Sequence, residues 1–108
     1  MFGHCYRIPA LHYRVRGVFT NAVPTDAYRG AGKPETVSTL ERLIDVAAAR
    51  LGVDRLALRR RNLVRPADLP YATAMGETYD GGDFPAVLDR LAERADLAGF
   101  AARRDASG

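Results

Sequence analysis

The sequence predicts an α+β fold: one N-terminal strand, a loop of small residues, and then about three helices. Three patterns carry this prediction. Apolar and polar residues alternate over residues 11–19, small residues crowd residues 24–35, and apolar residues recur at helical spacing in later stretches. A lone strand leaves both edges without hydrogen-bond partners, so we expect a piece of a larger fold that supplies the missing strands.

The predicted strand covers residues 11–19. Its side chains alternate in type, with Leu11, Tyr13 and Val15 between His12, Arg14 and Arg16. This two-residue period is typical of a strand with one buried face. Val18 and Phe19 extend the apolar character beyond Gly17.

The stretch PTDAYRGAGKPE, residues 24–35, is predicted to be a loop that another chemical group can approach closely. Gly30 and Gly32 lack a Cβ and adopt backbone angles closed to other residues, while Ala27 and Ala31 add little bulk. The alternative is a tight turn whose glycines only satisfy backbone geometry.

The end of this loop is suited to an anion. Pro34 fits the first turn of a helix, where exposed amides and the helix dipole favour negative charge. Arg29 adds a planar set of donors, and Tyr28 adds a flat surface with a polar tip. Phosphate or a similar oxyanion is therefore the predicted ligand.

The longest helix is predicted over residues 34–52, with Gly52 as its stop. Five apolar residues fall on one helical stripe that is expected to be buried: Val37, Leu40, Ile44, Ala47 and Leu51.

Two shorter helices are predicted farther along the chain. Asp54 is expected to cap a helix over residues 54–62, and Asp83 is expected to cap a third helix. The apolar stripe of the third helix comprises Phe84, Val87, Leu88 and Leu91. Residues 71–85 are interpreted as a loop rich in turn residues, and the tail 96–108 as helical at first and frayed at its end.

Composition excludes several classes of protein. The chain has 108 residues, 47% of them hydrophobic, which suits one globular unit. Its net charge of +3 comes from 16 basic and 13 acidic residues spread along the sequence, so no nucleic-acid partner is expected. The run Arg59, Arg60 and Arg61 spreads around a helix, and at least one of the three is expected to pair with carboxylates. No apolar stretch reaches the roughly 20 residues that span a bilayer, so no membrane partner is expected.

No metal or catalytic cluster emerges from the residues themselves. His4, Cys5 and His12 match no zinc-ligand spacing, and the acidic residues between 77 and 83 do not follow the calcium-loop order. Two serines, Ser38 and Ser107, were considered as nucleophiles, and neither has a histidine placed to act as its base. One cysteine excludes an internal disulfide and suits a reducing compartment, so we expect a cytoplasmic protein.

Five features in sequence resemble the molybdenum-cofactor-binding large subunit of the xanthine dehydrogenase, aldehyde oxidase and carbon monoxide dehydrogenase family. They are Thr20-Asn21, Ala27-Tyr28-Arg29-Gly30, Pro34-Glu35, Arg61-Asn62-Leu63, and Tyr79-Asp80 before Gly82-Asp83-Phe84. The resemblance extends over nearly the whole chain, and the order of the features makes it specific.

The resemblance implies an oxidoreductase that hydroxylates aldehydes, N-heterocycles or similar small substrates with oxygen from water. It implies a molybdenum–molybdopterin cofactor, in its cytosine dinucleotide form, and electron transfer to iron-sulfur clusters and FAD in partner subunits or domains. It also implies that one loop lies beside the molybdenum centre and binds the cofactor. The loop residues are Ala27, Tyr28, Arg29, Gly30, Ala31 and Gly32.

Two positions depart from branches of the family. The carbon monoxide-oxidising branch has a cysteine that carries copper-bound sulfur where this chain has Gly30, so carbon monoxide oxidation is not expected. The xanthine-oxidising branch has an aromatic residue in place of Ala31, so purine specificity is not expected either.

The family's large subunits run to several hundred residues and carry a catalytic glutamate whose motif has no match here. We therefore expect residues 1–108 to be one fragment of a molybdenum-cofactor-binding domain, inactive alone. Its expected partners are the remaining segments of the large subunit, the iron-sulfur and FAD subunits, and a small-molecule substrate. The alternative is a non-enzymatic remnant or interaction module whose loop binds no cofactor.

Overall fold

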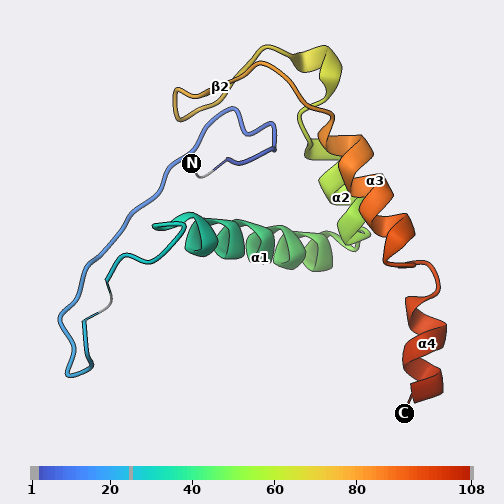
Figure 1. Cartoon of the computed structure of the whole chain (residues 1–108), viewed down its shortest axis with the longest axis horizontal. Helices are drawn as coiled ribbons and strands as arrows, with labels where there is room; N and C mark the ends of the chain where they lie inside the picture. The colour runs from blue at the N-terminus through green and yellow to red at the C-terminus, as the bar shows by residue number, and fades with distance from the viewer. Residues whose placement is uncertain (1–2, 25, 108) are drawn as a thin grey trace.

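The computed structural model describes residues 3–24 and 26–107 and consists mainly of helices joined by irregular segments (Figure 1). The elements in chain order are α1 (Lys33–Leu51), α2 (Arg55–Asn62), the short 3-10 helix η1 (Pro66–Asp68), β1 (Tyr71–Ala72), β2 (Thr78–Tyr79), α3 (Phe84–Arg94) and α4 (Phe100–Ser107). β1 and β2 pair antiparallel, with Tyr71 opposite Tyr79 and Ala72 opposite Thr78. The α+β class is therefore present, but its only described strands lie in the second half of the chain.

The predicted strand over residues 11–19 does not form, and this prediction is wrong for the chain by itself. These residues have no regular secondary structure and run away from the helices as an extended arm (Figure 1). Residues 14–19 make no backbone hydrogen bond to another described segment. A strand is defined by the ladder to its neighbour, and an alternating sequence does not create that neighbour.

Helix α1 confirms the predicted first helix within one residue at its start. Pro34 lies in its first turn, and Gly52 ends it in the left-handed conformation, with φ 64°. The Gly52 amide donates to the carbonyls of Ala48 and Ala49, which satisfies the helix end.

The buried stripe of α1 is shorter than predicted. Leu40, Ile44 and Ala47 are half-buried as expected, but Val37 is 41% exposed and Leu51 is 66% exposed. The middle of the helix contacts α2 through Arg59, and it contacts the N-terminal turn, residues 3–6, through Tyr6.

The predicted caps of α2 and α3 are confirmed. The Asp54 carboxylate accepts a hydrogen bond of 2.8 Å from the Ala57 amide, and Asp83 accepts one of 3.0 Å from the Ala86 amide. The stripe of α3 is only partly covered, because Phe84 and Leu88 are half-buried while Val87 and Leu91 are 68% and 61% exposed.

The tail and the segment 71–85 differ from the predictions. Residues 95–99 form turns, with Asp96 at a φ of 45°, and the helix α4 begins only at Phe100. The left-handed residue breaks the helical path between α3 and α4. The segment taken for a loop contains the β1–β2 hairpin, whose two-residue strands are too short to show a period.

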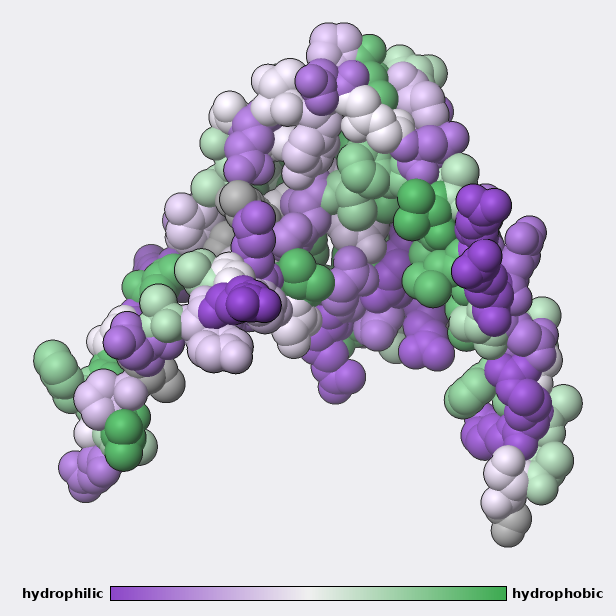
Figure 2. Space-filling view, viewed as in Figure 1, coloured by the Kyte–Doolittle hydropathy of each residue, from purple (hydrophilic) through white to green (hydrophobic). Residues whose placement is uncertain are grey.

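The small core lies where the N-terminal turn, α1 and the end of α2 meet. Its buried residues are Tyr6, Ala48, Leu63 and Val64. Tyr6 and Leu63 form an antiparallel bridge, and the Val64 amide donates to the Cys5 carbonyl at 2.8 Å. The radius of gyration is 17.1 Å, against about 13 Å for a compact domain of this length. Two arms extend from the central part, with hydrophobic residues on their surfaces (Figure 2).

Candidate functional site

The candidate loop consists of two successive turns that end at the N-terminus of α1. The Ala31 amide donates to the Tyr28 carbonyl at 2.8 Å, and the Lys33 amide donates to the Gly30 carbonyl at 2.9 Å. Three consecutive residues have positive φ values: Gly30 at 103°, Ala31 at 37° and Gly32 at 92°. Residues with a Cβ rarely adopt such angles, so the two glycines are required by the backbone path. Ala31 accepts a strain of about 1–2 kcal/mol.

The two glycines differ in the space around them. A Cβ on Gly30 would lie 3.0 Å from Cδ and 3.1 Å from Cγ of Pro34, so this glycine also lets the loop close on the start of α1. A Cβ on Gly32 would meet no atom within 4 Å. The outer side of the loop at Gly32 is therefore open to another group.

The loop offers hydrogen-bond donors that the described part of the chain does not use. The amides of Gly30 and Gly32 donate to no acceptor among the described residues. Arg29 is exposed and forms no ion pair with a described residue. Amide donors at a helix N-terminus together with a guanidinium group are suited to the oxygen atoms of an anion.

A hollow of about 480 Å³ lies against the loop. It is lined by Asp26, Ala27, Tyr28, Arg29, Ala31, Gly32, Pro34 and Glu35. Two carboxylates thus border it beside the one arginine, so attraction for an oxyanion depends on directed amide and guanidinium donors and not on a uniformly positive wall. Of the six predicted loop residues, 27–32, the structure assigns residues 29–32 to turns.

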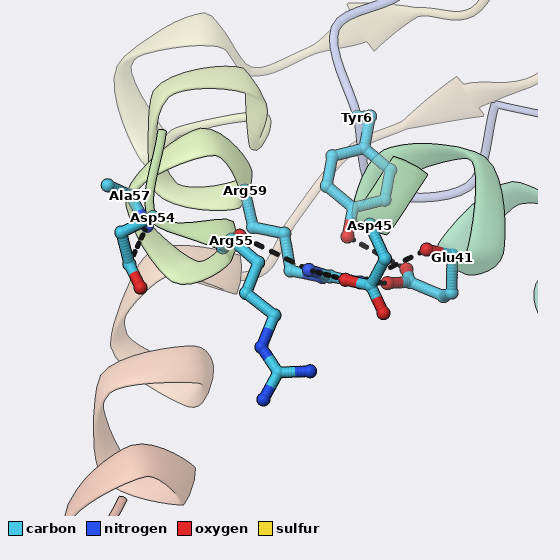
Figure 3. Close-up of polar contacts among 7 residues, drawn as sticks. All are labelled: Tyr6, Glu41, Asp45, Asp54, Arg55, Ala57 and Arg59. Atoms are coloured by element: carbon cyan, nitrogen blue, oxygen red, sulfur yellow. Dashed lines mark hydrogen bonds and ion pairs between the residues drawn. The ribbon is translucent and has the colours of Figure 1, made fainter. Parts of the chain in front are cut away.

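A polar network anchors α1, the helix that carries this loop (Figure 3). Arg59 of α2 donates from Nε to Oε2 of Glu41 and from Nη1 to Oδ1 of Asp45, both at 2.8 Å. The Tyr6 hydroxyl donates to the other carboxylate oxygen of Glu41, Oε1, also at 2.8 Å. The carboxylates of Glu41 and Asp45 thus connect three segments that are distant in sequence: the N-terminal turn, α1 and α2.

The network confirms that one residue of the arginine run pairs with carboxylates, and Arg60 pairs with Asp89 as well. The roles of Tyr6 and Glu41 were not predicted from the sequence. The one local signal was the spacing of Glu41 and Asp45, which places two carboxylates four residues apart on the same face of a helix.

The surroundings of the network shift the pKa values of its members. The hydrogen bond from Arg59 lowers the pKa of Asp45. Burial, together with the hydrogen bond to Glu41, raises the pKa of Tyr6 above its ordinary value. Near neutral pH the network therefore contains ionised Asp45 and a protonated Tyr6.

Two other residues considered as metal-site candidates, Asp83 and His4, lie outside the loop. Asp83 is the cap of α3, and the His4 Nε2 atom is buried without a hydrogen-bond partner among the described residues. Within residues 3–24 and 26–107, no three His, Cys, Asp or Glu side chains gather as a metal site. None of the helices in this part of the chain is long and apolar enough to cross a membrane.

The chain belongs to the molybdopterin cofactor-binding domain family, and the model of that family matches residues 1–63. The matched region contains the loop, α1 and α2. The family match therefore defines the class of protein, a molybdopterin cofactor-binding domain.

The relatives of this chain include large chains and large subunits of enzymes. The carbon monoxide dehydrogenase large chain of Hydrogenophaga pseudoflava is 36% identical over 103 residues, covering 94% of this chain and 13% of the relative. The nicotine 6-hydroxylase large subunit of Paenarthrobacter nicotinovorans is 37% identical over 100 residues, covering 93% of this chain and 12% of the relative. A solved structure of reconstituted CO dehydrogenase from Oligotropha carboxidovorans has a TM-score of 0.60 and 30% identity, covering 68% of this chain and 9% of that chain.

Proposed function

We propose that the loop of residues 27–32 binds the oxygen-rich part of a molybdenum–molybdopterin cofactor within a large subunit that hydroxylates small organic substrates. The observation that carries this proposal is the run of positive φ values at Gly30, Ala31 and Gly32, directly before α1 and inside the region matched by the cofactor-binding family.

The residues of the loop fit such a group. Gly32 leaves its outer side bare, and the amides of Gly30 and Gly32 donate to no acceptor among the described residues. Both glycines have positive φ values, at which a side chain would be strained. Arg29 would supply a charged donor to a cofactor oxygen, and Tyr28, 88% exposed, would offer a flat surface and a hydroxyl. When bound, the molybdenum group supplies the water-derived oxygen and receives the electrons of the oxidation.

The proposed substrate class follows from two positions at which this chain differs from branches of the family. Gly30 has no thiol for a copper-bound sulfur, so we propose no carbon monoxide oxidation, although the relatives include carbon monoxide dehydrogenases. Ala31 has a methyl group in place of a ring, so a purine would not be clamped there. Aldehydes and N-heterocycles remain the proposed substrates, and a nicotine 6-hydroxylase is among the relatives.

The proposed assembly is larger than this chain. The remaining segments of the large subunit would complete the cofactor site and supply the general base, and iron-sulfur and FAD subunits would carry electrons away. We propose the cytosine dinucleotide form of the cofactor and a cytoplasmic location, where the free Cys5 stays reduced.

The proposal is tested by replacing Arg29 with alanine in the chain co-expressed with the remaining large-subunit segments. Molybdenum and pterin are then measured per assembled subunit. We expect Arg29→Ala to lower cofactor content or turnover without changing the yield of assembled protein, since Arg29 is exposed and contributes little to folding. Arg50→Ala is the matched control, because Arg50 is exposed in the last turn of α1, at the end of this helix away from the loop. Equal cofactor content and equal turnover in both variants and the parent would contradict the proposal.

A further inference from the structure

The loop of residues 27–32 is attached to α1 by hydrogen bonds. The Lys33 amide donates to the Gly30 carbonyl at 2.9 Å, and the Thr36 amide donates to the Gly32 carbonyl at 3.1 Å. The backbone of residues 27–32 forms no hydrogen bond with any other helix or strand that the structure describes. A change in the direction of α1 therefore carries the loop with it.

Glu41 is the residue of α1 at which two other segments of the chain meet (Figure 3). Its Oε1 atom accepts a hydrogen bond from the Tyr6 hydroxyl, and its Oε2 atom accepts one from Nε of Arg59, both at 2.8 Å. The Nη2 atom of Arg59 also donates to the main-chain carbonyl of Glu41, at 3.2 Å. One carboxylate is thus bound by both the N-terminal turn and α2, and the helix backbone is held at the same point.

A second contact lies one turn farther along α1. The Nη1 atom of Arg59 donates to Oδ1 of Asp45 at 2.8 Å. Among the described residues, Glu41 and Asp45 make all the hydrogen bonds and ion pairs that join α1 to α2 or to the N-terminal turn. Glu41 is the nearer of the two to the loop. Two points of contact fix the direction of a helix, whereas a single point leaves the helix free to tilt.

The distance from Glu41 to the loop makes the loop position sensitive to the tilt of α1. A helix rises about 1.5 Å per residue, so the segment from Gly32 to Glu41 spans about 13 Å. A tilt of about 5° at Glu41 then moves the loop by about 1 Å. A displacement of about 1 Å at a functional site costs up to about 100-fold in function, and a well-supported site holds its groups within about 0.5 Å.

We propose that Glu41 is a positioning residue for the cofactor loop. Its carboxylate, held between Tyr6 and Arg59, fixes the direction of α1 and so sets where the loop of residues 27–32 meets a cofactor. Arg59 is required as an arginine, because three of its nitrogen atoms donate to three different acceptors, whereas a lysine has one nitrogen atom at its tip. The part of this inference that concerns the cofactor rests on the proposed function, and the part that concerns the loop does not.

The first measurement is the distance between the loop and α2 in the isolated 108-residue chain. Tyr28→Cys and Arg61→Cys supply two exposed positions for nitroxide labels, in a background that carries Cys5→Ser. Double electron–electron resonance gives the distribution of distances between the two labels. We expect Glu41→Ala to widen this distribution at least about twofold, because α1 loses its contact with Tyr6 and one of its two contact points with Arg59.

Three further variants separate positioning from a loss of stability. Leu88→Ala shortens a half-buried side chain of α3 that is not a member of the network, so it lowers stability and should leave the distances as in the parent. Arg59→Lys keeps the charge and is expected to widen the distribution as Glu41→Ala does. Tyr6→Phe removes a single hydroxyl group and is expected to widen it less, and this variant tests the same contact if Glu41→Ala lowers the yield of folded chain.

The second measurement is the molybdenum and pterin content of large subunits assembled from each unlabelled variant and the remaining segments. Glu41→Ala is expected to lower the content per assembled subunit at least about threefold, and Leu88→Ala to keep it within about 1.5-fold of the parent. Unchanged distances in Glu41→Ala would overturn the proposal, and so would equal effects of Glu41→Ala and Leu88→Ala.

The variant Arg29→Ala distinguishes this inference from the proposed function. Full cofactor content in Glu41→Ala, together with a loss in Arg29→Ala, would show that the loop binds the cofactor without help from Glu41, and this result also overturns the inference. Unchanged cofactor content and turnover in Arg29→Ala would instead contradict the proposed function. The distance measurement then decides by itself whether Glu41 fixes the loop.

Discussion

The substitution Arg59→Met tests whether the polar network holds α1 against α2. The methionine side chain is unbranched and apolar, like the aliphatic part of arginine, so the change removes mainly the guanidinium group. Glu41 then keeps only the hydrogen bond from Tyr6, and Asp45 loses its partner in this network.

The magnitude follows from the exposure of the partners. The Arg59 side chain is 13% exposed and that of Glu41 is 37% exposed. A hydrogen bond to a charged group contributes about 1.5–3 kcal/mol when buried, and an exposed ion pair contributes about 0.2–1 kcal/mol. Because one partner is largely shielded and the other is not, we expect the loss of the Arg59–Glu41 contact to cost about 1–2 kcal/mol.

The assay is urea unfolding of the isolated chain, followed by circular dichroism. A loss of this size moves the midpoint by about 1 M for a protein with a slope near 1–2 kcal/mol/M. Arg60→Met is the matched control, because Arg60 and its partner Asp89 are 44% and 52% exposed, and its cost is expected to stay below about 0.5 kcal/mol. Equal midpoints for the two variants would refute the reasoning.

Three further predictions concern the core, the pH response and the loop. Leu40→Ala should lower the free energy of unfolding by about 1–2 kcal/mol, less than for a fully buried leucine, while Leu43→Ala, at a position 59% exposed, should change it by less than about 0.5 kcal/mol. Because the pKa of Tyr6 is raised, its stabilising effect is present below the ordinary tyrosine pKa of about 10 and is lost as the pH rises further. The denaturation midpoint of the parent should therefore decrease when the pH is raised above about 10, and the midpoint of Tyr6→Phe should decrease less. Gly30→Ala should cost about 1–3 kcal/mol in loop strain, since φ is 103° and Pro34 lies 3.0 Å from the added Cβ, whereas Gly17→Ala meets no atom within 4 Å; similar unfolding free energies for these two variants would show that the loop conformation is not required.

Local signals allowed the helices and the loop to be predicted from the sequence. The caps Asp54 and Asp83 and the stop at Gly52 act within a few residues of their own positions, so their effects can be read from adjacent sequence. The crowding of glycine in residues 27–32 likewise predicted a backbone with positive φ values, which the structure has.

Features that need a distant partner could not be predicted in the same way. The alternating residues 11–19 describe one strand but not the strand beside it, and the structure leaves them without a ladder at 14–19. The Tyr6–Glu41 and Arg59–Glu41 contacts join residues 35 and 18 positions apart, so sequence spacing gives no sign of them. Val37 and Leu51 of α1 and Val87 and Leu91 of α3 remain exposed. Periodicity predicts which face of a helix is apolar, but not what covers that face.

The most direct test of the proposed function is a structure of the assembled large subunit with its molybdenum cofactor bound. The account predicts that the amides of Gly30 and Gly32 and the guanidinium group of Arg29 lie within about 2.7–3.2 Å of cofactor oxygen atoms. A loop that lies remote from the cofactor, or that is covered by other side chains, would contradict it.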